Sequence, residues 1–346
     1  MKILNSIFKK KKVEEAKFPS ELRLDLVSQD WVVIATGRAR RPETFKKDPV
    51  SSVIDEKEEI EKCFFCNLET QEKPVLISGS QKDWKVAVVP NKFPAFLPHP
   101  DLDETTEGGI YKKMNAVGFH EVVITRDHKK HMGQFSKEEI KEVVDAYQSR
   151  YLSLMKEKFV NNVSIFHNHG KTAGASVSHP HSQIITTPLV DIDLKNALLK
   201  SKAYSEENKE CVYCKMNEWE LKVKERIVFE NDGFIATCPF ASKMAFQTII
   251  SPKKHLSYFE KINEDEKWQF SEAFQKVLSK ICKGLNNPDY NFYLHTAPCD
   301  GKNHDYYHWH WTILPKTSTW AGFEIGTRIE ISTIEPEKAA EYLRNQ

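Results

Sequence analysis

The sequence predicts an α+β fold built from two similar halves, each an antiparallel sheet with helices packed on it. The main observation is an internal repeat. A Cys-x-x-Cys pair, a strand followed by a histidine, a capped helix, a further strand and a His-x-His triplet occur twice in this order. The stretch from His128 to His179 is nearly as long as that from His255 to His308. A repeat of this many elements is seldom accidental.

The repeat divides the chain of 346 residues into four segments. Residues 1–20 contain a run of lysines and are expected to form a flexible basic tail that leads into the fold. Residues 21–190 form the N-terminal half, and the polar, lysine-rich residues 191–210 are expected to link it to the C-terminal half, residues 211–346. This length suffices for two domains with cores of their own.

Strands and loops of the first half follow from apolar runs and turn residues. Alternating apolar residues in short runs predict strands at both ends of segment 21–36 and over segments 84–89, 119–125 and 161–166. Segments 43–60 and 99–113 are charged or glycine-containing and are expected to be loops, the second of them mobile. The second half repeats the pattern with strands over segments 247–251 and 290–295, and an apolar run at 313–314.

Each half also contains one amphipathic helix with a capping box. Ser136 with Glu139, and Asn263 with Glu266, have the residue types and the spacing of reciprocal N-terminal capping. The first helix is expected to bury one apolar face, made of Ile140, Val143, Val144, Tyr147, Tyr151 and Leu154. The second is expected to direct four residues inward: Trp268, Phe274, Leu278 and Ile281.

Composition excludes several classes of function. The formal net charge of +1 gives no support for nucleic-acid binding through bulk charge, and leaves only a local basic patch as an alternative. No apolar run approaches the roughly 20 residues that a membrane-spanning helix needs, and the order of residues in segment 1–18 is wrong for a secretory signal. The odd count of seven cysteines argues against a disulfide framework and favours metal-bound thiolates in a reducing cytoplasm.

The stretch from Phe166 to Pro188 is the centre of the sequence pattern. If the backbone is extended there, the spacing of two puts His179, His181 and Gln183 on one face of a strand. One imidazole can then bind a metal while the next faces a substrate. Gly170 and Gly174 allow close approach of the backbone to an anion. The competing interpretation is a histidine-rich turn of a β-protein.

Two metal sites are predicted from the paired motifs. Tetrahedral zinc needs two ligands beyond the two thiolates of a Cys-x-x-Cys pair, and two histidines lie downstream of each pair. The predicted sets are Cys63, Cys66, His128 and His179 in the first half, and Cys211, Cys214, His255 and His308 in the second. The alternatives are redox dithiols, His131 in place of His128, and participation of His310 in the second site, where it is otherwise an echo of His181.

Three arginines, Arg38, Arg40 and Arg41, follow the strand at the start of the chain. Such a cluster is usually a solvated turn. It also suits a phosphate clamp, because guanidinium groups donate to phosphate oxygens in pairs.

The motif Phe-x-Asn-x-Gly-(x)₃-Gly-x-Ser-(x)₂-His-Pro-His-x-Gln, from Phe166 to Gln183, resembles the galactose-1-phosphate uridylyltransferase family, a branch of the histidine-triad superfamily. Arg-Ala-Arg-Arg-Pro at 38–42 and Cys-x-x-Cys at 63–66 add to the resemblance, which extends from about residue 21 to the C-terminus. It implies two histidine-triad-like domains and a homodimer.

The resemblance also implies roles for individual residues. His179 is the zinc ligand, and His181 is the nucleophile that takes a nucleotidyl group from a nucleoside diphosphate sugar and releases a sugar 1-phosphate. Gln183 donates to the transferred phosphoryl group. The residues implied to bind substrate are Arg38, Arg41, Asn91, Phe93, Asn168, Gly174, Ser176, Ser182, Phe323 and Glu324. Zinc is expected at both metal sites, although the second holds zinc or iron in the family, because two cysteines favour zinc.

Two departures from the uridylyltransferase pattern bear on the substrate. Ser182 stands where the well-studied uridylyltransferases have glycine, and the segment around Phe323 and Glu324 replaces much of their hexose-phosphate segment. Both look more like the ADP-glucose phosphorylase members of the family. The leading hypothesis is transfer of UMP from UDP-glucose to galactose 1-phosphate. The alternatives are an ADP-glucose phosphorylase that uses phosphate as acceptor, and a non-catalytic, zinc-stabilised nucleotide-binding module.

Overall fold

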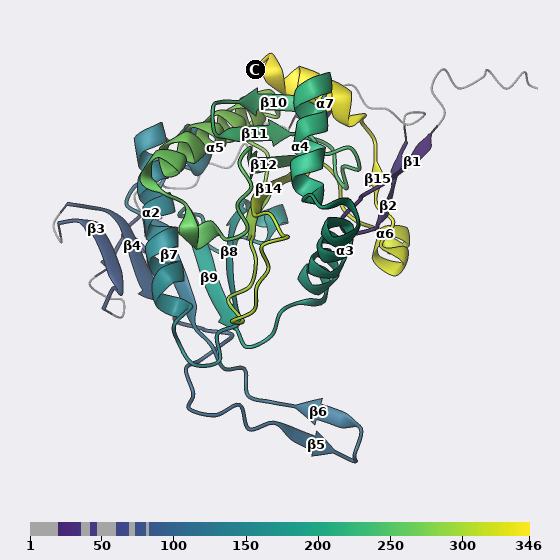
Figure 1. Cartoon of the computed structure of the whole chain (residues 1–346). Helices are drawn as coiled ribbons and strands as arrows, with labels where there is room; N and C mark the ends of the chain where they lie inside the picture. Colours follow the sequence, from purple (N-terminus) through teal and green to yellow (C-terminus); the bar gives the residue numbers. More distant parts are fainter. Residues whose placement is uncertain (1–19, 36–41, 47–59, 69–72, 81–82) are drawn as a thin grey trace, which may run out of the picture.

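The computed structural model describes residues 20–35, 42–46, 60–68, 73–80 and 83–346. Arg38 and Arg41 lie outside these residues, as does most of the predicted basic tail. The centre of the fold is one ten-stranded antiparallel sheet in the order β10-β11-β12-β14-β13-β8-β9-β7-β4-β3 (Figure 1). Its strands are β3 (Leu76–Gly79), β4 (Trp84–Pro90), β7 (His120–Thr125), β8 (Asn162–His169), β9 (His181–Thr187), β10 (Ile227–Glu230), β11 (Phe234–Thr237), β12 (Thr248–Pro252), β13 (Tyr290–His295) and β14 (His310–Pro315).

The sheet confirms the α+β repeat and shows how the halves are joined. Five strands come from each half, and the order β8-β9-β7-β4-β3 of the first half is mirrored by β13-β14-β12-β11-β10 in the second. The halves meet where β13 pairs with β8, with Asn291 opposite Asn168 and Tyr293 opposite Phe166. Hydrogen bonding between backbones therefore fixes the second half against the first at the strand that leads into the central motif.

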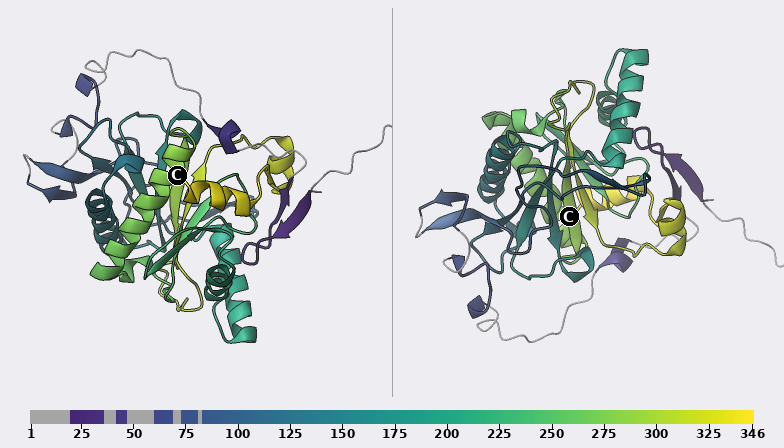
Figure 2. Two further views of the ribbon diagram at one scale, coloured as in Figure 1. Left: turned by 90° about the horizontal axis from the view of Figure 1, so that it is seen from above. Right: turned by 90° about the horizontal axis from the view of Figure 1, so that it is seen from below.

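One face of the sheet is covered by two long helices, α2 (Lys137–Leu154) and α5 (Glu264–Gly284), which pack on each other (Figure 2). Both predicted capping boxes are present, because Ser136 and Asn263 each accept from the backbone three residues on and their own N–H groups are bonded by Glu139 and Glu266. The other helices are α3 (Ile192–Asn208), α4 (Val212–Val223), α6 (Gly322–Thr327), α7 (Pro336–Arg344) and the 3-10 turns η2 (Pro42–Phe45), η4 (Met132–Gln134), η5 (Lys171–Ala173) and η6 (Phe259–Lys261).

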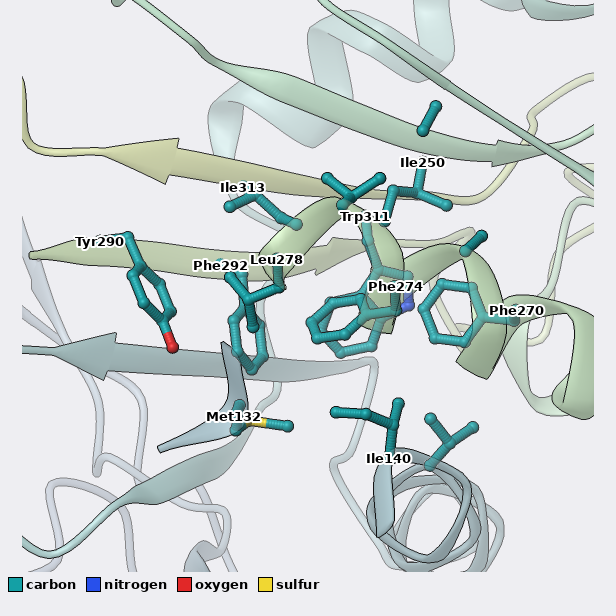
Figure 3. Close-up of a cluster of buried hydrophobic side chains, with 14 of the residues drawn as sticks. Met132, Ile140, Ile250, Phe270, Phe274, Leu278, Tyr290, Phe292, Trp311 and Ile313 are labelled. Atoms are coloured by element: carbon teal, nitrogen blue, oxygen red, sulfur yellow. The ribbon is translucent and has the colours of Figure 1, made fainter. Parts of the chain in front are cut away.

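Aromatic side chains fill the core between the helices and the sheet (Figure 3). Phe274 of α5 meets Phe292 of β13 edge to face, with ring centroids 5.0 Å apart. Trp311 of β14 stacks on Tyr147 of α2 at 5.7 Å. Rings of this size bury much apolar area and dominate core energetics. The two halves thus share one core as well as one sheet.

One segment differs from the sequence expectation, and the linking segment is largely helical. Within the stretch expected to be a mobile loop, the exposed strands β5 (Thr105–Glu107) and β6 (Tyr111–Lys113) pair as a hairpin that projects from the body (Figure 1). The linking segment 191–210 is mostly the helix α3, capped by Asp191. The Asp191 side chain accepts from the backbone N–H of Leu194, and such a cap favours a helix in this link between the halves.

The inward orientation expected for Trp268 is wrong. Its ring remains 37% exposed, and the ammonium groups of Lys137 and Lys141 lie over it at 5.4 and 5.5 Å. Cation–π contact with two lysines of α2 explains why an aromatic residue at the edge of the helix stays at the surface. Phe274, Leu278 and Ile281 are buried as predicted.

A small sheet flanks the second half. It consists of β1 (Glu21–Leu24), β2 (Trp31–Ile34) and β15 (Ile331–Ser332), and β15 runs parallel to β2. Arg23 and Arg226 both bond Glu337 of α7, which ties this sheet to the body. Among the described residues, none of the helices has the length and apolar character to cross a membrane.

Replacing Phe292 with alanine is expected to lower the free energy of unfolding by about 3–5 kcal/mol, because the ring is fully buried between α5 and the sheet. Chemical denaturation measures this change. Leu199→Ala is the matched control, since that side chain is 66% exposed and its loss should cost little. Equal destabilisation by both changes would contradict the assignment of the core.

Candidate functional site

Along strand β9, which carries the end of the motif from Phe166 to Gln183, successive side chains lie on opposite faces of the sheet. His181 and Gln183 share the face opposite α2 and α5, because successive side chains of a strand point in opposite directions. Their neighbours on β7 are Ile124 and Val122, which pair with His181 and Gln183 respectively. His179 lies just before the strand and is fully buried. The face of His181 and Gln183, called the open face because neither α2 nor α5 covers it, lies next to the metal-ligand cluster and is therefore the candidate active site.

His181 has one defined tautomer. Its Nδ1 lies 2.9 Å from the carbonyl oxygen of His179, and a carbonyl can only accept, so Nδ1 carries the proton and Nε2 carries the lone pair. Burial lowers the pKa of His181 below its usual value, in opposition to that hydrogen bond, which raises it. The imidazole is thus neutral near pH 7, with Nε2 available as a nucleophile.

The four residues predicted for the first metal site are brought together. The ligand atoms of Cys63, Cys66, His128 and His179 all lie within 4.8 Å of one another. Cys66 Sγ lies 3.2 Å from Nδ1 of His128 and 3.4 Å from Nδ1 of His179, and the two Nδ1 atoms are 3.2 Å apart. His131 is not in this group; its ring packs on that of His169 at 5.0 Å.

These distances fit a tetrahedral metal centre. Zn–N bonds of about 2.0–2.1 Å and Zn–S bonds of about 2.3 Å place N and N about 3.3 Å apart and N and S about 3.6 Å apart in a tetrahedron. His179 Nε2 is 2.6 Å from the Thr125 carbonyl oxygen, so it carries the proton and leaves Nδ1 as the ligand atom. Burial raises the pKa of the Cys66 thiol to about 12, so a bound cation is needed to keep it as thiolate.

The second cluster repeats this arrangement. The ligand atoms of Cys211, Cys214, His255 and His308 also lie within 4.8 Å of one another. His255 Nε2 is 2.6 Å from the Asp305 carbonyl oxygen and His308 Nε2 is 2.9 Å from that of Pro252, so both histidines again turn Nδ1 toward the cysteines. All seven cysteines are free thiols, so neither pair is a disulfide here.

His310 is the structural counterpart of His181 but has different surroundings. Its Nδ1 lies 3.2 Å from the His308 carbonyl oxygen, as in the first half. The ring of His295, however, stacks on His310 with centroids 4.6 Å apart, and Thr312 stands where the first half has Gln183. His310 is not part of the second ligand cluster.

The loop between β8 and β9 contains both glycines of the motif. Gly170 and Gly174 both have positive φ, 81° and 90°, which glycine adopts without strain. A Cβ on Gly170 would lie 2.1 Å from Asp289 Oδ1, so only glycine fits there. The other oxygen of Asp289 accepts from the backbone N–H of Thr172 at 2.7 Å and from its hydroxyl at 2.5 Å.

Asn168 is also held by the second half. Its Oδ1 accepts from Nδ2 of Asn291 at 2.7 Å, and Asn291 donates to the Ala173 carbonyl at 2.8 Å as well. The Asn168 amide therefore turns its own NH₂ group away from Asn291. Neither Asn291 nor Asp289 was predicted. Their contacts depend on the pairing of β13 with β8, and no local sequence pattern indicates that pairing.

Ser182 lies on the helix-covered face. Its hydroxyl is 2.5 Å from the hydroxyl of Tyr147 and 3.1 Å from Nδ1 of His167, and the residue is 3% exposed. The structure thus places the side chain of this predicted substrate-binding residue on the sheet face opposite His181 and Gln183. Its hydrogen bonds there anchor the backbone between those two residues.

Among the described residues, the other predicted substrate residues are exposed or half-buried. Asn91 forms a turn by accepting from the backbone N–H of Phe93, whose ring is 81% exposed. Ser176 is exposed in the loop before His179. Phe323 and Glu324 lie on α6, which Figure 1 shows beside α3 at the end of the molecule away from β3 and β4. The side chain of Glu324 caps that helix through the N–H of Ala321.

Replacing Asp289 with alanine is expected to loosen the loop. It removes a charged acceptor that bonds Thr172 twice, and such bonds are worth about 1.5–3 kcal/mol each. Amide hydrogen exchange at Thr172 should accelerate by roughly ten- to a hundredfold, measured by mass spectrometry on peptides that cover residues 168–178. Asp83→Ala, which breaks an exposed ion pair with Arg126, is the control. Unchanged exchange in the Asp289 variant would contradict this account of the loop.

Comparisons with known proteins agree with the geometry. The profile of the galactose-1-phosphate uridyl transferase N-terminal domain matches residues 10–191, and that of a domain of unknown function matches residues 112–346. The ADP-glucose phosphorylase of Arabidopsis thaliana is 33% identical over 94% of this chain and 92% of its own length. The galactose-1-phosphate uridylyltransferase of Thermotoga maritima is 26% identical over 94% and 98%.

A solved structure gives the same result. The crystal structure of an ADP-glucose phosphorylase from Arabidopsis thaliana with bound ADP-glucose superposes with a TM-score of 0.79 at 30% identity, covering 94% of this chain and 99% of that one. The chain therefore belongs to the galactose-1-phosphate uridylyltransferase family and is a nucleotidyltransferase.

Proposed function

We propose that this protein transfers UMP from UDP-glucose to galactose 1-phosphate, with a covalent nucleotidyl-histidine on His181 as intermediate. The observation that carries the proposal is the hydrogen bond between His181 Nδ1 and the His179 carbonyl, which leaves Nε2 with its lone pair on the open sheet face. The transferase relatives, named galactose-1-phosphate uridylyltransferase, support the choice of substrates.

The reaction has two similar steps. In the first, Nε2 of His181 attacks the α-phosphorus of the nucleoside diphosphate sugar, a P–N bond forms, and the bond to the bridging oxygen breaks. The electron pair leaves with glucose 1-phosphate. In the second, a phosphate oxygen of galactose 1-phosphate attacks the same phosphorus, and the P–N electrons return to Nε2. Ping-pong kinetics follow from this sequence.

Donors near His181 are proposed to stabilise the charge that develops on the phosphoryl oxygens. Gln183 lies two residues along the strand on the same face. The hydrogen bond from Asn291 orients the NH₂ group of Asn168. Asp289 bonds the backbone of the loop that contains Gly174. Donors fixed before the reaction need no reorganisation during it. Arg38, Arg41 and Ser176 are proposed to bind the phosphates, and Asn91 and Phe93 the nucleoside.

Zinc is the metal proposed for both ligand clusters, since two thiolates and two imidazoles suit it. A closed shell of four protein ligands supplies structural stabilisation and leaves no position for a reactive water. In the first cluster the effect on catalysis is indirect. Fixing the ring of His179 also fixes its carbonyl, which orients His181.

An ADP-glucose phosphorylase is the second candidate. Ser182 favours it, because its hydroxyl is built into a buried chain with Tyr147 and His167 and is not an incidental replacement of glycine. The relative from Arabidopsis thaliana named ADP-glucose phosphorylase supports it too. The same nucleophile would then carry AMP, and inorganic phosphate would be the acceptor.

A homodimer in the cytoplasm is proposed as the working form. Phe323 and Ile325 of α6 are 50% and 70% exposed. Because α6 lies away from β9 within one chain, a hexose contact by Phe323 and Glu324 requires α6 of a second copy (Figure 1). The seven free thiols support a reducing compartment.

The experiment is intact mass spectrometry after mixing the protein separately with UDP-glucose and ADP-glucose. Wild type is expected to gain one UMP from UDP-glucose, and His181→Ala to gain nothing, because the P–N bond has no other proposed partner. Initial rates with galactose 1-phosphate and with inorganic phosphate then identify the acceptor. His310→Ala, at the equivalent position of the second half, is the matched control and should still form the adduct.

Other outcomes separate the alternatives. An AMP adduct together with faster turnover on phosphate would overturn the uridylyltransferase proposal in favour of the phosphorylase. Full activity of His181→Ala would overturn the mechanism. Nucleotide binding without turnover on either sugar would indicate a non-catalytic binding module.

Removing one ligand is expected to empty one metal site. Cys66→Ser should reduce the zinc content from about two to about one per chain, lower the melting temperature and slow adduct formation, because His179 loses its anchor. Metal analysis by plasma mass spectrometry and thermal unfolding measure this. Cys299→Ser is the control, since that thiol lies outside both clusters and bonds only weakly to the Val160 carbonyl. Unchanged zinc content in Cys66→Ser would refute the first site.

A further inference from the structure

We infer that His120, the first residue of β7, is a positioning residue that sets the orientation of the Gln183 amide for the nucleotidyl transfer proposed above. The inference rests on that proposed function and adds a residue to it. The ring of His120 lies between two structures, the turn at residues 91–95 and the side chain of Gln183. The side chains of His120 and Gln183 are both half-buried on the open sheet face.

The hydrogen bonds of His120 define its tautomer. The backbone N–H of Ala95 donates to Nδ1 at 3.2 Å, so Nδ1 carries the lone pair and Nε2 carries the proton. Nε2 lies 2.7 Å from Oε1 of Gln183, to which it therefore donates. The backbone of the 91–95 turn thus determines which ring nitrogen faces the glutamine.

The other tautomer fits less well. With the proton on Nδ1, the ring would oppose the N–H of Ala95 and would place the Nε2 lone pair against Oε1 of Gln183. It would satisfy only Nδ2 of Asn91, which approaches Nε2 at 3.0 Å. Two of the three contacts therefore favour a protonated Nε2. A backbone donor that cannot rotate away decides the choice.

This arrangement fixes the glutamine amide. An amide side chain can present either its oxygen or its NH₂ group to a ligand, and the two orientations differ only by a half-turn. Because His120 holds Oε1, the NH₂ group is the one left for the open face beside His181. A phosphoryl oxygen needs a donor there, whereas the reversed amide would present a carbonyl oxygen and repel the developing negative charge.

His120 also connects two parts of the proposed site. Asn91 shapes the turn by accepting from Phe93, and the same turn supplies the N–H that orients His120. The nucleoside-side turn and the phosphoryl donor are therefore linked through one imidazole. His120 pairs with Ile185 in the register of β7 and β9, and this pairing fixes the backbone position of His120 relative to β9.

The experiment measures the single-turnover rate of adduct formation on His181 in wild type, His120→Leu, His120→Gln, Gln183→Ala and the double variant His120→Leu/Gln183→Ala. Loss of the Gln183 donor should slow the step by about a hundred- to a thousandfold. His120→Leu should slow it by about ten- to a hundredfold, the usual effect of losing an outer partner of a functional side chain, with KM little changed.

The conservative variant and the double variant separate positioning from simple structural support. His120→Gln keeps an N–H donor near the position of Nε2. Its rate should therefore stay within about threefold of the wild-type rate, a smaller loss than the tenfold or greater loss expected for His120→Leu. The double variant should be no slower than Gln183→Ala alone, because His120 acts only through that amide. Thermal unfolding of every variant shows whether the fold is intact.

Thr186→Val is the matched control. Its hydroxyl accepts from the backbone N–H of Phe119, so the change removes one buried hydrogen bond from the same strand pair on the other sheet face. It should lower stability and leave the rate unchanged. An unaltered rate in His120→Leu, or independent rate losses that multiply in the double variant, would overturn the inference. Absence of an adduct and of turnover in wild type would instead refute the proposed function.

Discussion

The arrangement of His179 links the structural and the chemical parts of the site. Its ring lies in the first ligand cluster, bonded through Nε2 to the Thr125 carbonyl, while its own carbonyl accepts from Nδ1 of His181. One residue thereby connects the ligand cluster to His181, the proposed nucleophile, and fixes its tautomer. Pro180, between the two histidines, restricts the backbone that joins them. The chemistry at Nε2 depends on this short connection.

The second half of the chain is part of the first half's site. Pairing of β13 with β8 brings Asn291 to Asn168 and Asp289 to Thr172, so the loop that precedes His179 is shaped by residues more than a hundred positions away. The shared core, in which Tyr147 stacks on Trp311 and His167 stacks on Phe292, holds the two halves in this register. A separated first half would lack these contacts.

The repeat has kept its architecture and diverged in its chemistry. Phe65 packs on His181 with centroids 4.9 Å apart, and Tyr213 packs on His310 at 5.2 Å, so even the ring beside each histidine is repeated. His295 stacks directly on His310, however, while the equivalent position in the first half is the smaller Asn168. Both histidines are buried, so the two halves differ in the side chains that lie beside the histidine and not in its exposure.

The sequence by itself determined the α+β class, the repeat, both capped helices and the two sets of four ligands, because hydrophobic period, capping residues and Cys-x-x-Cys spacing are local patterns. It also placed His181 and Gln183 on one strand face. Only the tertiary structure decided that ten strands form one sheet, that α2 covers the face on which Ser182 lies, and that His120, Asp289 and Asn291 contact residues of the site. Pairing between distant strands decides which side chains meet, and no local periodicity encodes that partner.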